Sequence, residues 1–121
     1  MTTEAHGGLV LFFVAARGPA LASEQDALDL IGATYGTQTD VLVVPAERFA
    51  PQFFDLATRQ AGLFFQKLQN YRLRLVILGD VSGHVARSKA LRDFVTETNR
   101  TGHHLFAADR EAMLAGLGGR G

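Results

Sequence analysis

The sequence predicts an α/β protein: a mostly parallel sheet of four or five strands with about four helices packed on it. The first observation is the apolar run at residues 73–78, which a glycine-bearing turn and an amphipathic helical segment follow. Such uninterrupted runs are typical of strands that are covered on both faces of a parallel sheet. The second observation is that strand-like and helical segments alternate along the chain with short connections, which favours parallel pairing through crossover helices.

Length, charge and cysteine content restrict the class of protein. The 121 residues are enough for one core, so we expect a single domain over residues 1–121, frayed at residues 1–8 and 118–121. Twelve basic and twelve acidic residues give zero net charge, which argues against a nucleic-acid partner. The absence of cysteine excludes disulfides and thiolate metal sites and fits a reducing cytoplasm.

The first half of the chain opens with a predicted strand at residues 9–16. This apolar run is too short for a membrane span, and no basic residue precedes it as in a signal peptide, so we expect a cytoplasmic protein without membrane contact. Residues 17–19 turn the chain. Ser23 and Asp26 then match a capping box, which predicts a helix that ends near Gly36.

The middle of the chain contains a second predicted strand at residues 40–44, which Pro45 ends, and an irregular stretch up to residue 54. Asp55 is placed to cap a helix that runs to about Asn70. The helical spacing predicts a core stripe of Ala57, Ala61, Phe64, Phe65 and Leu68.

The last part of the chain begins with the strand at residues 73–78, and Ser82 is the expected N-cap of the next helix. One face of that helix carries Leu91, Phe94, Val95 and Thr98. Gly102 is the expected left-handed C-cap, residues 103–107 form another strand, and Asp109 caps a short final helix.

Two corners of this sheet are candidate ligand sites, residues 47–58 and 79–88. Ligands of open α/β sheets bind beyond the carboxyl ends of strands, where helices begin. We expect Arg87 in the first turn of its helix, pointing along the sheet edge, where it suits a phosphate or another small anion. The candidate ligand- or partner-binding residues are Asp55, Thr58, Asp80, Ser82, His84, Arg87 and Ser88.

The same residues have a purely structural interpretation, which the sequence leaves open. Ser82 then caps a helix, and Arg87 pairs with Asp80 or Asp55. Residues 79–83 contain neither of the standard glycine-rich phosphate loops.

Metal binding and catalysis are not predicted. We expect His103 and His104 on a strand, where adjacent side chains face opposite sides and do not share a metal ion. The nearby serine, histidine and aspartate side chains lack a nucleophile elbow. We therefore predict no catalytic residue, no metal site and no cofactor.

A docking surface is predicted on the second helix. Leu56 and Leu63 lie off its core stripe, and two solvent-facing leucines are better explained by a partner than by the monomer. With Phe53 and Lys67 they form the expected dimer or partner surface.

A set of residues along the chain carries a resemblance: Phe53-Phe54-Asp55-Leu56, Gln66-Lys67, Asn70-Tyr71-Arg72, Gly79-Asp80, Ser88-Lys89-Ala90-Leu91-Arg92-Asp93-Phe94, Glu97 and Asn99. On these residues the chain resembles an uncharacterised bacterial family of unknown function over about residues 9–117. That family is similar to STAS-type domains, the fold of anti-sigma-factor antagonists. The resemblance implies a STAS-like fold that binds partner proteins and, in some members, nucleotides or small anions.

The phosphorylation switch of STAS domains is only partly matched. That switch is an Asp-Ser-Ser-Gly stretch at the start of the second helix, and the comparable residues here are Asp55-Leu56-Ala57-Thr58. Only Thr58 offers a hydroxyl, which argues against phosphoserine switching. Arg59 replaces a glycine of the uncharacterised family, and Leu63 replaces a glutamate.

Two functions from different classes follow. The first is a non-catalytic regulatory or protein-interaction domain that docks a partner protein or a second copy of itself. The alternative is a small-anion or nucleotide-binding protein, an enzyme included, that uses the crevice between residues 55–58 and 79–88. A pocket on which Arg87 and Asp55 converge would favour the alternative, and a flat edge with exposed Leu63 and Phe53 would favour docking.

Overall fold

The computed structural model describes residues 2–118 and confirms the α/β class. Its five-stranded sheet has the order β1-β2-β3-β4-β5, with only the first pair antiparallel. The strands are β1 (Thr2–His6), β2 (Leu9–Phe13), β3 (Val41–Pro45), β4 (Arg74–Leu78) and β5 (Leu105–Ala107).

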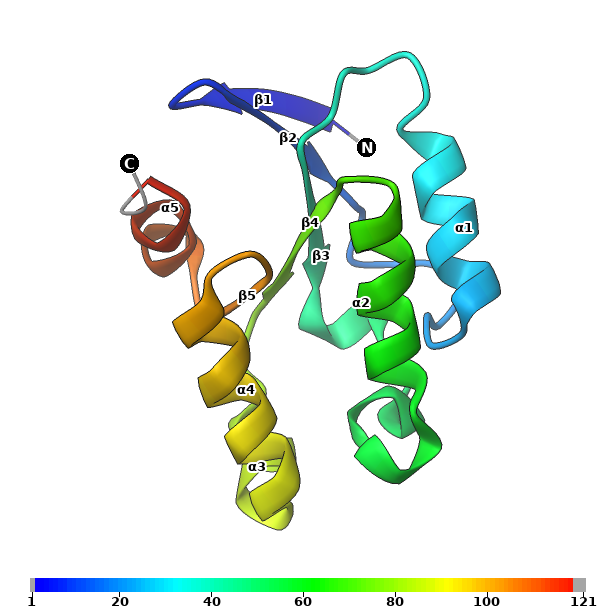
Figure 1. Cartoon of the computed structure of the whole chain (residues 1–121), viewed down its shortest axis with the longest axis vertical. Coiled ribbons are helices and arrows are strands. Elements are labelled where there is room, and N and C mark those ends of the chain that lie inside the picture. The colour runs from blue at the N-terminus through cyan, green and yellow to red at the C-terminus, as the bar shows by residue number, and fades with distance from the viewer. Residues whose placement is uncertain (1, 119–121) are drawn as a thin grey trace.

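The helices surround this sheet (Figure 1) and are divided unequally between its two faces. They are α1 (Glu24–Ala33), α2 (Gln60–Asn70), α3 (Ser82–Arg87), α4 (Lys89–Thr101) and α5 (Arg110–Gly118). Because the parallel strands lie side by side in chain order, right-handed crossovers place α1, α2 and α4 on one face. The last helix, α5, covers the other face.

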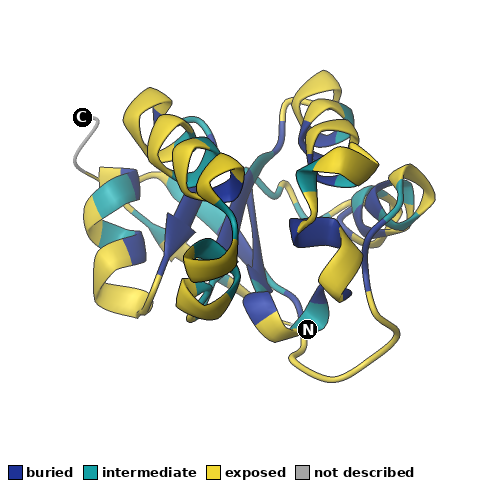
Figure 2. Cartoon of the chain, turned by 90° about the horizontal axis from the view of Figure 1, so that it is seen from below, coloured by how far each residue is buried: buried dark blue, intermediate teal, exposed yellow. Residues whose placement is uncertain are grey.

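Successive side chains of each strand point to opposite faces of the sheet, so these apolar strands supply both faces with apolar side chains. Leu42, Val44, Leu75 and Ile77 face the cluster under α1, α2 and α4, whereas Val41, Val43 and Val76 pack with Met113 and Leu117 of α5. Figure 2 shows the strands buried between helices whose outward faces are exposed.

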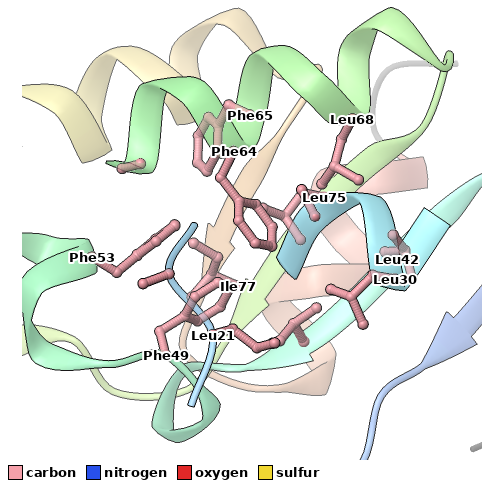
Figure 3. Close-up of a cluster of buried hydrophobic side chains, with 14 of the residues drawn as sticks. Leu21, Leu30, Leu42, Phe49, Phe53, Phe64, Phe65, Leu68, Leu75 and Ile77 are labelled. Carbon is pink, nitrogen blue, oxygen red and sulfur yellow. The ribbon is translucent and has the colours of Figure 1, made fainter. Parts of the chain in front are cut away.

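Phenylalanines fill the larger cluster beneath α2 (Figure 3). The Phe49 and Phe53 rings stack with centroids 4.2 Å apart, and Phe64 meets each of them edge-on at 5.5 and 5.4 Å. Phe53 is only 1 % exposed, so its expected place on a docking surface is wrong. It lies in η2 (Pro51–Phe54), a 3-10 turn that directs its ring into the core.

The N-terminal segment Thr2–His6 is a strand, so the predicted fraying of residues 1–8 is wrong for this part of the chain. His6 pairs with Leu9 across a two-residue turn. Gly7 and Gly8 both have positive φ, 54° and 83°, as this tight hairpin turn requires. At the other end Gly118 closes α5, and residues 119–121 lie outside the described part of the chain.

The second helix begins later than expected. Asp55 caps the 3-10 turn η3 (Leu56–Thr58) by accepting a hydrogen bond from the Ala57 backbone N–H at 3.1 Å, and α2 starts only at Gln60. Ala57 is therefore exposed and does not join the core stripe. The remaining members of the stripe, from Ala61 to Leu68, are buried as expected.

The expected helix from Ser82 is in fact two helices, α3 and α4. Ser88 has extended backbone angles, and its hydroxyl accepts a hydrogen bond from the Leu91 N–H at 3.1 Å, so it caps α4. Ser82 is the first residue of α3 instead of its cap, and Asp80 Oδ1 accepts its N–H at 2.8 Å. Arg87 consequently ends α3 and does not lie in a first helical turn.

His103 and His104 precede β5, and the expectation that they face opposite sides is wrong. Their ring centroids lie 4.5 Å apart. His104 Nδ1 accepts a hydrogen bond from the Leu75 N–H at 3.0 Å, which ties the start of β5 to β4. Burial lowers the pKa of His104 to about 4, and the charges of His103 and Arg74 add to this effect, while the Phe65 carbonyl opposes it.

The half-buried position of Phe94 gives a first prediction. Its ring contacts Phe65 and Phe106 at the edge of the core, with centroids 5.3 and 6.1 Å away, whereas Phe64 is completely buried. We expect Phe64→Ala to lower the free energy of unfolding by about 4 kcal/mol and Phe94→Ala by about half as much, measured in urea. Equal losses would contradict the peripheral position of Phe94.

The lowered pKa of His104 gives a second prediction. Between pH 6.5 and about 4 the unfolded chain binds a proton that the folded chain does not. Stability should therefore fall as the pH is lowered through this window, by about 1.4 kcal/mol per pH unit and about 3 kcal/mol in total. Urea unfolding at pH 7 and pH 4 measures the loss.

The control for this prediction is His84→Gln, which should keep the loss of the wild type, whereas His104→Gln should reduce it. NMR titration of the His104 ring tests the same point in the wild type. A midpoint near 6.5 would show that burial does not hold the ring neutral.

Candidate functional site

A shallow apolar hollow, here called the α2–α4 groove, lies where α2 and α4 stand apart. Its lining residues are Leu56, Arg59, Gly62, Leu63 and Phe94, and its volume is about 360 Å³. Helix α2 packs closely along α1, whereas α4 lies at a distance from α2 (Figure 1). The Phe65 and Phe94 rings fill the space between α2 and α4 below the groove.

The α2 side of the groove has an unusual backbone. Arg59 has φ of 64°, a left-handed conformation that costs a side-chain-bearing residue about 1–2 kcal/mol. Gly62 lies inside the helix, and a Cβ added there would meet nothing within 4 Å. The groove is therefore open at Gly62. Leu63 is 46 % exposed beside it.

A second hollow, here called the Arg87 pocket, adjoins the groove at its η3 end. Pro51, Phe54, Asp55, His84, Arg87 and Ser88 line a volume of about 400 Å³. The His84 ring stacks on Phe54 with centroids 4.2 Å apart. Within residues 2–118, the Arg87 guanidinium forms no hydrogen bond or ion pair. The structural interpretation that pairs Arg87 with Asp80 or Asp55 is thus wrong.

Four of the seven candidate binding residues meet in the Arg87 pocket, and three do not. Asp80 and Ser82 line a different hollow of about 260 Å³ beyond the ends of β4 and β5. There the Ser82 hydroxyl and backbone N–H lower the pKa of Asp80. The Thr58 hydroxyl lies within 3.0 Å of the Gln52 carbonyl and 2.8 Å of the Asp55 carbonyl, and so stabilises the turn before α2.

The residues of the expected docking surface also lie in different parts of the structure. Leu56 and Leu63 both line the α2–α4 groove. Lys67 instead lies 3.5 Å from Glu24 and forms an ion pair with α1. Because Phe53 is in the core, the apolar surface consists of Leu56 and Leu63 together with Phe94.

The groove is also lined by Arg59, Gly62 and Phe94, which the sequence pattern did not predict as site residues. Phe94 carried the signal of a core residue, because its spacing matches the buried face of α4. Gly62 was a usable signal. Glycine inside a helix lowers helix stability, so its presence there calls for an explanation other than folding. The contact between α2 and α4 itself has no signature in the sequence.

No group of three or more histidine, cysteine, aspartate or glutamate side chains in residues 2–118 could hold a metal ion. None of the helices formed by these residues has both the length and the apolar character needed to cross a bilayer.

Comparison with known proteins identifies the class to which the chain belongs. The family described as "Domain of unknown function (DUF4180)" matches residues 7–117. The match covers nearly the whole sequence, so the chain belongs to this family. No curated protein and no solved structure matches it.

Proposed function

We propose that this protein is a non-catalytic regulatory or protein-interaction domain of the cytoplasm. Its α2–α4 groove binds a segment of a partner protein that carries an apolar side chain next to acidic residues. The observation that carries this proposal is the groove of about 360 Å³, in which half-exposed Leu63 lies beside Leu56 and Phe94.

The apolar part of the partner segment follows from the lining of the groove. Leu56 and Phe94 are partly buried against the core cluster and form the floor of the groove, and Leu63 forms the rim of the groove. An apolar side chain that enters the groove removes Leu63 from water, which is favourable at about 25 cal/mol per Å² of apolar surface buried.

The acidic part follows from charge. Arg59 lines the groove, and Arg87 lies in the adjoining pocket. Both are exposed, and neither forms an ion pair with another residue in the range 2–118. Asp55, the only acidic residue of the two hollows, already accepts a backbone hydrogen bond. Carboxylates of a partner match this excess of positive charge, and such complementarity favours fast and specific association.

The test begins with capture from cytoplasmic extract on the wild type and on Leu63→Glu. A protein retained by the wild type alone is then purified, and its Kd is measured by calorimetry. We expect Leu63→Glu to weaken binding more than tenfold, because it adds a charge at the apolar rim next to an acidic partner. Raising the salt concentration should also weaken binding.

Two glycines give a matched pair of variants. An added Cβ meets nothing within 4 Å at Gly62 of α2 or at Gly32 of α1, so each glycine-to-alanine change should raise stability by about 0.5 kcal/mol. Only Gly62→Ala narrows the groove, and it should weaken partner binding several-fold while Gly32→Ala leaves it unchanged. Equal binding by the two variants would contradict docking in the groove.

Self-association is a separate outcome of the same test. Analytical ultracentrifugation at micromolar concentration distinguishes a monomer from a homodimer. A dimer that Leu63→Glu dissociates would mean that a second copy of the chain, and not an acidic partner, occupies the groove.

A small-anion site in the Arg87 pocket is the second candidate function. The specific observation is the unpaired Arg87 guanidinium, which shares a pocket with His84 and Ser88. Arginine can bind a phosphate or carboxylate through two parallel hydrogen bonds. The Ser88 hydroxyl is already used in capping α4, so Arg87 would supply most of the interaction.

Calorimetric titration with sulfate and with ATP tests this site. Arg87→Lys should weaken binding even though it keeps the charge, because the fork of the guanidinium is lost. Arg92→Lys, on the exposed face of α4, is the control. The absence of binding at millimolar anion, or full binding by Arg87→Ala, would exclude the site.

A further inference from the structure

The two edges of the sheet are protected differently. Strand β5 has only three residues, and the Asn99 side chain pairs with the outward N–H and C=O of Phe106 at 2.8 and 3.1 Å. Short or covered edge strands of this kind prevent pairing with another chain. The other edge is β1, which is five residues long and lies at the far margin of the sheet (Figure 1). No side chain of residues 2–118 covers its backbone in the same way.

The backbone of Ala5 points outward from the β1 edge. Along an antiparallel pair, residues that exchange hydrogen bonds with the partner strand alternate with residues that do not. Ala5 lies opposite Val10, whose N–H and C=O bond instead to Asp40 on the β3 side, at 2.8 and 2.9 Å. The N–H and C=O of Ala5 therefore face away from β2, and those of Thr3 do so two residues earlier. Neither residue has a backbone partner outside β2 in the described chain.

Strand β1 also lacks the features that usually block an open edge. It contains no proline, lysine or bulge, and Thr3 and Ala5 are exposed. Its one charged residue, Glu4, forms an ion pair with Arg110 of α5, which holds the carboxylate on the α5 face of the sheet. The edge consequently presents a regular row of backbone donors and acceptors to a further strand.

We propose that a second copy of this chain pairs with β1 in the antiparallel direction, with Ala5 opposite Ala5 across a two-fold axis. The two five-stranded sheets then form one continuous sheet. This interface is separate from the α2–α4 groove and from the Arg87 pocket, and it does not depend on either proposed function.

The side chains of β1 explain why the added strand is a second copy. With Ala5 on the axis, Glu4 lies opposite the second copy's His6 on the same face of the sheet, and this pair occurs twice. An imidazole N–H can donate a hydrogen bond to a carboxylate, and the His6 ring has no hydrogen bond or ion pair within residues 2–118. Pairing Thr3 with Ala5 instead would bring the Glu4 carboxylates of both copies together, which is unfavourable. The strand is thus complementary to itself in one register.

The apolar contribution to this interface is small. On the face opposite Glu4, Ala5 lies beside half-buried Val10, so the pairing places two alanines between two valines across the joined sheets. Two five-residue strands bury less than the roughly 1,200–2,000 Å² of a stable interface, so we expect a weak dimer that forms at high protein concentration.

Cysteine variants test the register directly, because the chain contains no cysteine of its own. Directly opposite residues of a hydrogen-bonded antiparallel pair have Cα atoms about 5.5 Å apart, a separation that a disulfide spans. Ala5→Cys should therefore oxidise to a covalent dimer. Thr3→Cys is the matched control on the same exposed face, and its two copies lie about 13 Å apart in this register. It should cross-link at least tenfold more slowly. Equal rates, or a faster rate for Thr3→Cys, would overturn the proposal.

Analytical ultracentrifugation at about 0.5 mM protein tests the unmodified interface, a concentration suited to a weak contact. The wild type should show a monomer–dimer equilibrium. Ala5→Pro should be monomeric, because it removes an outward N–H that β2 does not use, whereas Ala5→Ser keeps this N–H and should dimerise. A monomeric wild type, or equal dimerisation of the two variants, would overturn the proposal.

Leu63→Glu separates this dimer from occupation of the α2–α4 groove. The variant should dimerise like the wild type and still form the Ala5→Cys cross-link when the two changes are combined. Loss of the dimer and of the cross-link in Leu63→Glu would place the contact in the groove and contradict pairing through β1.

Discussion

The handedness of the crossovers is the constraint on which the rest of the structure depends. With the parallel strands in chain order, α1, α2 and α4 must all lie on one face of the sheet. Four strands present a face only about 15 Å wide, whereas each helix is about 10 Å across. The three helices therefore do not fit flat on it. Helix α2 packs along α1, and α4 stands apart, which leaves hollows along the α2–α4 boundary.

Many of the residues that carry the family resemblance are explained by this fold. Phe53 fills the core, Asp55 and Ser88 cap a turn and a helix, and the Asn99 side chain forms two hydrogen bonds with the backbone of Phe106 in β5. These positions determine where elements begin and how they join. They say little about a ligand or a partner, so the residues that line the hollows are the better guide to function.

The sequence predicted the parts of the fold that local spacing controls, namely the parallel strands, the capping box of α1 and the buried face of α4. The prediction was wrong where one or two residues determine the local structure against the pattern of the longer segment around them. The Gly7 and Gly8 pair is a hairpin turn, but the polar residues before it read as a frayed end. Ser88 interrupts an otherwise continuous amphipathic pattern, so the break between α3 and α4 was missed.

The candidate site was only partly predictable, because the α2–α4 groove and the Arg87 pocket are lined by residues from separate helices. Asp55, His84, Arg87 and Ser88 follow from the two corners of the sheet and lie together in the Arg87 pocket, as expected. The α2–α4 groove depends instead on the spacing between α2 and α4. Its lining contains three locally unfavourable features: left-handed Arg59, the helical glycine Gly62 and half-exposed Leu63. Folding alone would favour glycine at the first, alanine at the second and a polar residue at the third. Their concentration on one wall of one groove is what binding, rather than stability, would require.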